Sequence, residues 1–468
     1  MHDNSRPSVF QTISAAFAFA ARLSFAAVVI LIPVRFRIVL LSRPMPPLYS
    51  DYTDFLLFAA DIALLTVLAM WIISLLLAPR KPTLGPRHIW IPLAGLTLAG
   101  WISAASSVDP FLSVYHAIRL SALFWFYVYI VNEIRSAGWI ILPVGLQILI
   151  QSIVALAQFI AQRSVDLQNL GELYLNPAWP GVSVVIANGV RLLRAYGLSD
   201  HPNILGGCLA FGLLVILSAY LNVHKSFPIL TALIPAFPAL LVTFSRSAWL
   251  AFLGGVIFII SLNFITRKFE SMRQLPWLAL MCLFILAPFF LAYARFFGAR
   301  LNAGNTFTTP TVEQQSIGER FLLINSTLPI LIKHPLTGIG LGASPDALKS
   351  YYPNFPVSYE PPHLTILDAA LETGLLGAVF YLALILFPFV IFFSHRESLL
   401  PNPLTFTAIS LLLSIIIVGF FDYYTWLLVP GRLWQWLAWG LWAVALQGAA
   451  KKDSPAAVSY PIPSLPVG

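Results

Sequence analysis

The chain has 468 residues, of which 59% are hydrophobic and only 10% are charged. Soluble domains carry about 25% charged residues, so this composition excludes a soluble globular protein and indicates a polytopic membrane protein. The 27 Lys and Arg residues outnumber the 19 Asp and Glu residues by 8. In a membrane protein such an excess indicates the orientation of the chain in the membrane and binding to anionic partners, rather than binding to nucleic acid. Cys208 and Cys282 both lie in apolar runs, which argues against a disulfide framework and against a metal cluster.

Apolar runs long enough to be membrane helices recur along the chain and predict an all-α bundle of about twelve transmembrane helices. The runs are at about 11–33, 55–78, 89–105, 114–132, 138–161, 203–222, 226–243, 247–265, 275–294, 364–393, 404–421 and 430–449. The first run follows the polar stretch 1–6 and lacks a small-residue cleavage site, so we expect an anchor and not a removed signal peptide. The run at 226–243 contains three prolines and is the weakest of the twelve.

The distribution of basic residues predicts that both termini face the cytoplasm. With that orientation, most Lys and Arg residues between the spans fall on the inner side, as the positive-inside rule requires. The short outer loops then hold Arg35, Arg37, Arg43 and Arg246, and the first three of these argue against the assignment.

Two connections are unusually long, and both fall on the predicted outer face. They run from about 162 to 202 and from about 295 to 363. The second contains Ile317–Lys333, an apolar stretch with charged ends, which predicts an interfacial or re-entrant helix. The chain therefore divides into helices 1–5 with the first long loop (1–202), a membrane core (203–449) and a Pro/Ser-rich tail (450–468) that we expect to be disordered and cytoplasmic.

Arg246 is the first candidate for chemistry, in Thr243-Phe-Ser-Arg-Ser-Ala-Trp249 at the outer end of a span. An arginine there either reaches lipid phosphates or presents its guanidinium to a substrate phosphate, with Ser245 and Ser247 as further donors. Arg320, at the start of the predicted interfacial helix, either pairs with a neighbouring glutamate or also presents its guanidinium to a substrate phosphate.

His363 follows two prolines where a long apolar helix is predicted to begin. A helix N-terminus disfavours the charged imidazolium, and a neutral imidazole is what a general base requires. The alternative is a histidine that caps the helix or meets a lipid headgroup. Asp368 and Glu372 follow in the same helix, and buried carboxylates there either form a site or hold helices together.

The end of the first long loop gathers Arg194, Asp200, His201 and Asn203 where the next span begins. One Asp-His pair without a second ligand is weak support for a metal site, so we expect a helix cap and a pocket wall here. Asp422, near the eleventh span, is either part of this pocket or a loop contact in an aromatic belt. The glycine-rich segment 338–342 has no following Lys-Ser/Thr and is not a nucleotide loop.

These motifs, in this order, resemble the O-antigen ligase and polymerase superfamily of bacterial membrane glycosyltransferases. The resemblance runs from about Arg191 to Trp442. Its pieces are Arg194-x2-Gly-x3-His-Pro-Asn203, Ser245-Arg-Ser-Ala-Trp249, Arg320 with His334-Pro-Leu-Thr-Gly-Ile-Gly340, and His363-x3-Leu-x4-Glu-x-Gly-x2-Gly377. Where the family often has Asn, Ser or Gln after the histidine, this chain has Leu364, which weakens the ligase assignment more than the superfamily assignment.

The resemblance implies a multi-pass protein of the bacterial inner membrane whose active site faces the periplasm. It implies transfer of a saccharide from undecaprenyl diphosphate to an acceptor hydroxyl, with inversion and without a metal or other cofactor. Arg246 and Arg320 would clamp the diphosphate and His363 would act on the acceptor hydroxyl. Arg194, Ser245, Ser247, His201 and Asp422 would bind substrate.

Four alternatives stay open from the sequence alone. A polymerase, whose acceptor is another lipid-linked unit, and a protein-directed oligosaccharide transferase share the ligase chemistry and differ in the acceptor. A transporter of a small anion such as bicarbonate is a rival from another class, although the sequence shows no inverted repeat or broken helices meeting at the midplane. A structural membrane subunit without catalysis is the fourth.

Overall fold

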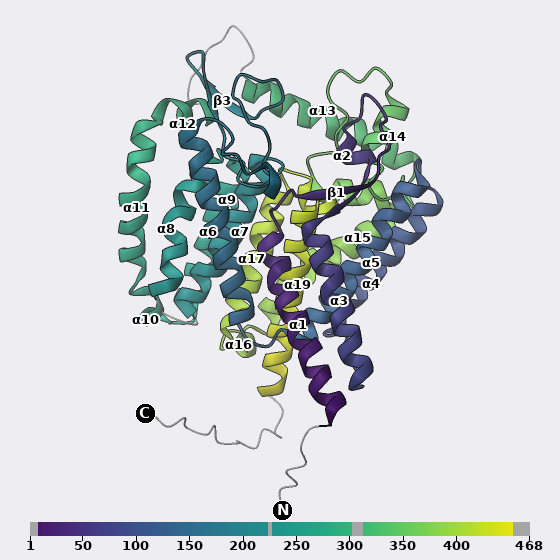
Figure 1. Cartoon of the computed structure of the whole chain (residues 1–468), viewed down its shortest axis with the longest axis vertical. Coiled ribbons are helices and arrows are strands. Elements are labelled where there is room, and N and C mark those ends of the chain that lie inside the picture. Colours follow the sequence, from purple (N-terminus) through teal and green to yellow (C-terminus); the bar gives the residue numbers. More distant parts are fainter. Residues whose placement is uncertain (1–7, 223–226, 302–311, 453–468) are drawn as a thin grey trace, which may run out of the picture.

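The computed structural model describes residues 8–222, 227–301 and 312–452, and within them it is a bundle of long helices (Figure 1). Nine of the described helices are long and apolar enough to cross a membrane. They are α1 (Val9–Leu31), α3 (Ala59–Leu77), α4 (Arg87–Ala105), α5 (Pro110–Glu133), α6 (Gly138–Ala161), α7 (Pro202–Asn222), α9 (Arg246–Ile265), α11 (Leu275–Ala292) and α15 (Thr365–Ser394). The other three predicted runs coincide with helices α8 (Phe227–Val242), α17 (Pro403–Gly419) and α19 (Val429–Lys452), and for these the membrane crossing stays a prediction.

Further helices, most of them short, lie in the connections between these helices. They are α2 (Ser50–Thr53), the 3-10 helix η1 (Gln168–Leu170), α10 (Phe269–Met272), α12 (Ala294–Arg300), α13 (Val312–Lys333), α14 (Ser344–Tyr351), α16 (Arg396–Leu399) and α18 (Tyr424–Leu427).

The fold is not purely helical, because two antiparallel hairpins are present: β1 (Arg37–Leu41) pairs with β2 (Phe55–Phe58), and β3 (Val184–Ala187) pairs with β4 (Val190–Leu193). The predicted disordered tail lies outside the described residues from 453 onward.

Helix α7 is the centre of the bundle. Its apolar residues are buried on every side, and it packs against α6, α8, α9, α17 and α19. Helix α11 is the opposite case, since Phe284 and Leu291 are more than 80% exposed and α11 lies at the edge of the bundle (Figure 1). A large apolar side chain that faces outward is stable in lipid but not in water, so this edge supports a membrane location.

The bundle has two different ends. Helix α1 begins and α19 ends at one of them, as expected for an even number of crossings (Figure 1). Glu133 lies towards this end, at the end of α5, where its carboxylate accepts hydrogen bonds from Arg22, Arg80 and the indole of Trp71. The opposite end carries the hairpins and α12, α13 and α14. The predicted interfacial stretch 317–333 is helical, and α13 lies across this opposite end of the bundle.

Helix α15 is broken at Gly374, whose φ of 68° and ψ of −176° suit glycine almost exclusively. The break frees backbone groups that a membrane protein has to satisfy internally. The segment 335–340 does so: Ile339 and Gly340 donate to the carbonyls of Leu371 and Glu372, at 2.9 and 3.0 Å, and Leu375 donates to Pro335. The glycine-rich segment that is not a nucleotide loop thus docks against a helix break, which the sequence did not reveal.

Candidate active site

Two cavities adjoin at the end of the bundle that carries α13. The first, of ≈ 500 Å³, has mostly apolar walls and we call it the arginine cavity; the second, of ≈ 470 Å³, is polar and we call it the polar cavity. Both are lined by Asn203, Arg300, Arg320 and His363, which therefore form their common boundary.

The arginine cavity brings together the three residues that the sequence predicted to be catalytic. Arg246 comes from α9, Arg320 from α13 and His363 from the loop before α15, and Arg300 from the end of α12 joins them. Ile317, Phe321 and Phe420 are among the apolar residues that complete the walls. The cavity therefore combines three guanidinium groups with apolar walls, which makes it suitable for a polyanion attached to an apolar chain.

The position of Arg246 is fixed by the turn between α8 and α9. Ser245 is buried and caps α9, accepting a hydrogen bond from the Ala248 amide at 3.4 Å. Arg194 Nε donates to the Thr243 carbonyl at 2.7 Å, and Arg300 Nε donates to the Phe244 carbonyl at 2.8 Å. Two arginines therefore hold the turn that begins α9 with Arg246.

His363 faces Tyr423 and Glu360 at the boundary of the cavities. Its ring meets the Tyr423 ring edge-on, with the centroids 4.9 Å apart, and its Nε2 lies 3.9 Å from the Glu360 carboxylate. Burial, together with the nearby Arg320 charge, lowers the pKa of His363 to about 4, although Asp422 acts in the opposite direction. The imidazole is therefore neutral at pH 7, with one ring nitrogen unprotonated.

Glu360 lines the polar cavity and was not among the site residues predicted from the sequence. Burial raises the pKa of its carboxyl to about 7, with further contributions from Asp422 and Glu319, while Arg320 opposes the shift. The carboxyl is thus partly protonated near neutral pH. A group whose pKa lies near the working pH exchanges protons most readily with a neighbouring group.

Arg194, Asn203 and Asp422 form a hydrogen-bonded chain along the wall of the polar cavity. Arg194 is buried; it donates to Ser183 Oγ at 3.1 Å and to Asn203 Oδ1 at 2.5 Å. Asn203 Nδ2 in turn donates to Asp422 Oδ2 at 3.1 Å, and the Tyr423 amide donates to Asp422 Oδ1. Much of the donor capacity of Arg194 is therefore used within the protein, and its contribution is to position Asn203 and the α8–α9 turn.

His201 lies in the same wall as a neutral imidazole. Burial and the charges of Arg194, Arg300 and Arg320 lower its pKa well below the ordinary value. Its Nδ1 accepts from the Asn203 amide at 3.1 Å, so the proton resides on Nε2, which lies 3.3 Å from Ser183 Oγ.

The predicted residues thus divide into three groups. Arg246, Ser247, Arg320 and His363 line the arginine cavity, whereas Arg194, His201 and Asp422 line the polar cavity. Ser245 lines neither and serves as the helix cap. Arg300 was missed, since it sits in a long loop without a recognisable motif and only the fold brings it to the boundary.

Asp368 and Glu372 lie apart from both cavities and are fully buried. Ser344 donates to Asp368 at 2.6 Å and to Glu372 at 3.1 Å, and the Trp426 indole donates to Glu372 at 2.8 Å. These contacts join α14, α15 and α18, which favours the interpretation that the two carboxylates hold helices together.

A family model matches part of the chain that contributes to this site. Residues 231–382 match the model of a family described as O-antigen ligase, which confirms the resemblance to the O-antigen ligase and polymerase superfamily over that segment. The segment includes Arg246, Arg300, Arg320 and His363. No curated protein matches the chain significantly.

Proposed function

With residues 231–382 matching the O-antigen ligase family, we propose that the protein is a membrane glycosyltransferase that moves a saccharide from undecaprenyl diphosphate to an acceptor hydroxyl at the extracytoplasmic face. The observation that carries the proposal is the meeting of Arg246, Arg320 and His363 in one cavity with apolar walls. These residues lie on three segments far apart in the sequence. A diphosphate on a polyprenyl chain combines negative charge, which suits the arginines, with an apolar chain, which suits the apolar walls.

The arginines act on the leaving group. Arg246 and Arg320 bind the diphosphate of the donor, and Arg300 adds a third positive charge at the boundary. As the bond between the sugar C1 and the phosphate oxygen breaks, negative charge grows on that oxygen, and preorganised guanidinium groups stabilise it more than water does. Undecaprenyl diphosphate leaves into the apolar part of the cavity.

His363 acts on the acceptor. Its neutral imidazole accepts the proton of the acceptor hydroxyl while the acceptor oxygen forms the new bond to C1 from the face opposite the phosphate. The anomeric centre is inverted, and no metal is required for any part of this exchange. Glu360, next to His363, is placed to orient the ring or to take up the proton.

The proposal is tested with protein purified in detergent, an undecaprenyl-diphosphate oligosaccharide and candidate acceptors, followed by mass spectrometry of both products. We expect a heavier acceptor and free undecaprenyl diphosphate. His363→Ala should slow transfer by roughly 10²–10⁴-fold and Arg246→Ala by about 10²–10³-fold, since these are the usual costs of losing a general base and an electrostatic stabiliser.

Arg246→Lys is the matched control for charge. It keeps one positive charge but loses the planar fork, so transfer should recover only in part relative to Arg246→Ala. Transfer that survives His363→Ala at full rate would contradict the catalytic role of that histidine. Folded protein that neither binds the lipid donor nor transfers would shift the assignment towards a transporter. The acceptor that gains mass separates a ligase from a polymerase and from a protein-directed transferase.

A further inference from the structure

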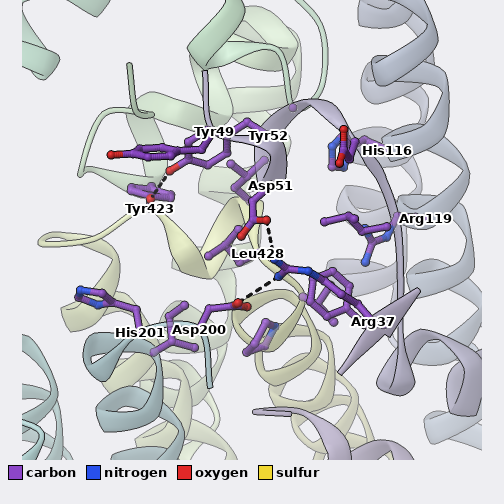
Figure 2. A pocket seen from close by; sticks show the side chains of 18 of the residues that line it. Arg37, Tyr49, Asp51, Tyr52, His116, Arg119, Asp200, His201, Tyr423 and Leu428 are labelled. Carbon is purple, nitrogen blue, oxygen red and sulfur yellow. Dashed lines mark hydrogen bonds and ion pairs between the residues drawn. The ribbon is translucent and has the colours of Figure 1, made fainter. Parts of the chain in front are cut away.

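A third cavity, of ≈ 190 Å³, is lined by residues drawn in Figure 2 and adjoins the polar cavity. The two share the lining residues His201, Ile204, Tyr423 and Leu428. The remaining walls come mostly from the N-terminal part of the chain: Arg37 of β1, Tyr49 to Tyr52 at and around α2, and Tyr115 to Arg119 of α5. We call this third space the hairpin cavity, after the β1–β2 hairpin that forms one side of it.

The charges of the hairpin cavity are balanced by ion pairs within the protein. Arg37 donates to Asp51 at 2.5 Å and to Asp200 at 3.0 Å, and Figure 2 shows its guanidinium between the two carboxylates. Arg119 is paired with Asp61 at 2.7 Å. Because the positive groups are already neutralised, a phosphate gains little here, whereas a neutral ligand with many hydroxyl groups meets both donors and acceptors.

Aromatic rings form another part of the hairpin cavity. Tyr49 and Tyr52 contact each other edge-on, with the centroids 6.1 Å apart, and the Tyr52 hydroxyl is 2.7 Å from the Tyr423 hydroxyl (Figure 2). Aromatic faces pack against the C–H faces of a sugar while hydroxyls and carboxylates bind its edge. A space of ≈ 190 Å³ suits one sugar ring and not an oligosaccharide.

The order of the three cavities gives this space its place in the reaction. The arginine cavity meets the polar cavity at His363, and the polar cavity meets the hairpin cavity at Tyr423, whose ring contacts His363. When one sugar ring of a saccharide reacts beside His363, the hairpin cavity therefore has room for the next ring of that saccharide. Among the lining residues only Gly342 falls within the family match at 231–382, so this wall belongs to the part of the chain that the match does not cover.

We propose that the hairpin cavity is a binding subsite for one neutral sugar ring, next to the ring that reacts. The proposal rests on the proposed transferase function. The ring has two possible sources, the glycan of the donor beyond its first sugar or the glycan of the acceptor, and both carry the same hydroxyl chemistry.

The test measures hydrogen–deuterium exchange of the peptides covering 37–58 in the full-length protein in detergent. The probe is the repeat-unit oligosaccharide released from the surface polysaccharide of the source organism, free of lipid and phosphate. We expect millimolar probe to slow exchange of these peptides. Asp51→Asn, which removes a charged acceptor, and Tyr52→Phe, which removes one hydroxyl, should each raise the apparent Kd about tenfold. Asp166→Asn, a matched change of an exposed acid outside the cavity, should leave it unchanged.

The two sources are separated in the His363→Ala protein, in which the donor is not consumed. Protection of 37–58 by the lipid-linked donor alone assigns the cavity to the donor glycan. Protection that appears only when free oligosaccharide is added to the donor-bound protein assigns it to the acceptor. Absence of protection under both conditions would overturn the subsite, even if transfer is normal and depends on His363. Protection without any transfer would leave the subsite standing and refute the transferase.

Discussion

Glu360 shows at the scale of a single residue how the site alters the chemistry of a side chain. Its pKa is raised from 4.5 to about 7, chiefly because burial disfavours the charged form. At pH 4 the carboxyl is protonated in both the folded and the unfolded chain, so the shift has no effect on stability. Between pH 4.5 and about 7 the unfolded chain releases the proton first, and folding becomes less favourable as the pH rises. Above pH 7 this loss is constant.

Glu360→Gln should therefore stabilise the protein in a pH-dependent way. Gln has the shape of the protonated acid but never ionises, so the variant should equal wild type at pH 4 and exceed it at pH 8, by at most about 3 kcal/mol. Thermal unfolding in detergent at both pH values measures the difference. Glu397→Gln, an exposed acid in α16, gives the baseline for losing one charge. A gain for Glu360→Gln that is the same at both pH values would contradict the raised pKa.

The site residues themselves could be predicted only in part. Arg246, Arg320 and His363 were candidates because of their positions beside predicted helices, and only the resemblance to known motifs joined them in one site, because no periodicity in the sequence brings three such distant positions together. Arg300 and Glu360 were not selected, since an arginine at the end of a short loop helix and a glutamate before two prolines have no pattern of their own. Their significance comes from tertiary contacts, with Phe244 for Arg300 and with His363 for Glu360.

At the scale of elements, apolar runs predicted the helices well, since a membrane segment has to satisfy its backbone internally. The hairpins were not predicted. Phe55–Phe58 continues directly into the apolar helix α3, so nothing in its composition separates strand from span. Arg37–Leu41 is too short to show an alternating pattern. The break in α15 was also invisible, because Gly374 is one of several glycines in an apolar run and its partner segment 335–340 is distant in the sequence.

Gly374→Ala tests that break. A Cβ at this position would lie 2.1 Å from the Leu336 carbonyl oxygen and 2.6 Å from the Thr337 nitrogen, and the backbone conformation excludes alanine on its own account. We expect a loss of at least about 1–3 kcal/mol in stability, measured by thermal unfolding in detergent. Gly318→Ala in α13 is the control, since nothing lies within 4 Å of its added Cβ and alanine favours a helix. Equal melting temperatures for the two variants would show that the break is not required.

At the scale of the whole molecule, the basic residues that oppose the predicted orientation are held in ion pairs. Arg35 and Arg37 pair with Asp200, and Arg43 pairs with Asp109 at 2.8 Å. The positive-inside rule counts Lys and Arg residues and not net charge, so these ion pairs do not remove the cluster as an observation against the orientation. The orientation with both termini inside remains the prediction, and it would place all three cavities on the outer face.

Cysteine labelling in intact cells tests this orientation directly. In a chain with Cys208 and Cys282 replaced by alanine, Asn169→Cys and Asn354→Cys report the two long loops at the end that carries the cavities, and both positions are exposed. Ser136→Cys and Glu397→Cys report the opposite end and are exposed as well. A membrane-impermeant maleimide should label the first two and reach the second two only after the membrane is permeabilised. The reverse pattern would put the arginines and His363 on the cytoplasmic side, where a donor that is used at the outer leaflet could not reach them.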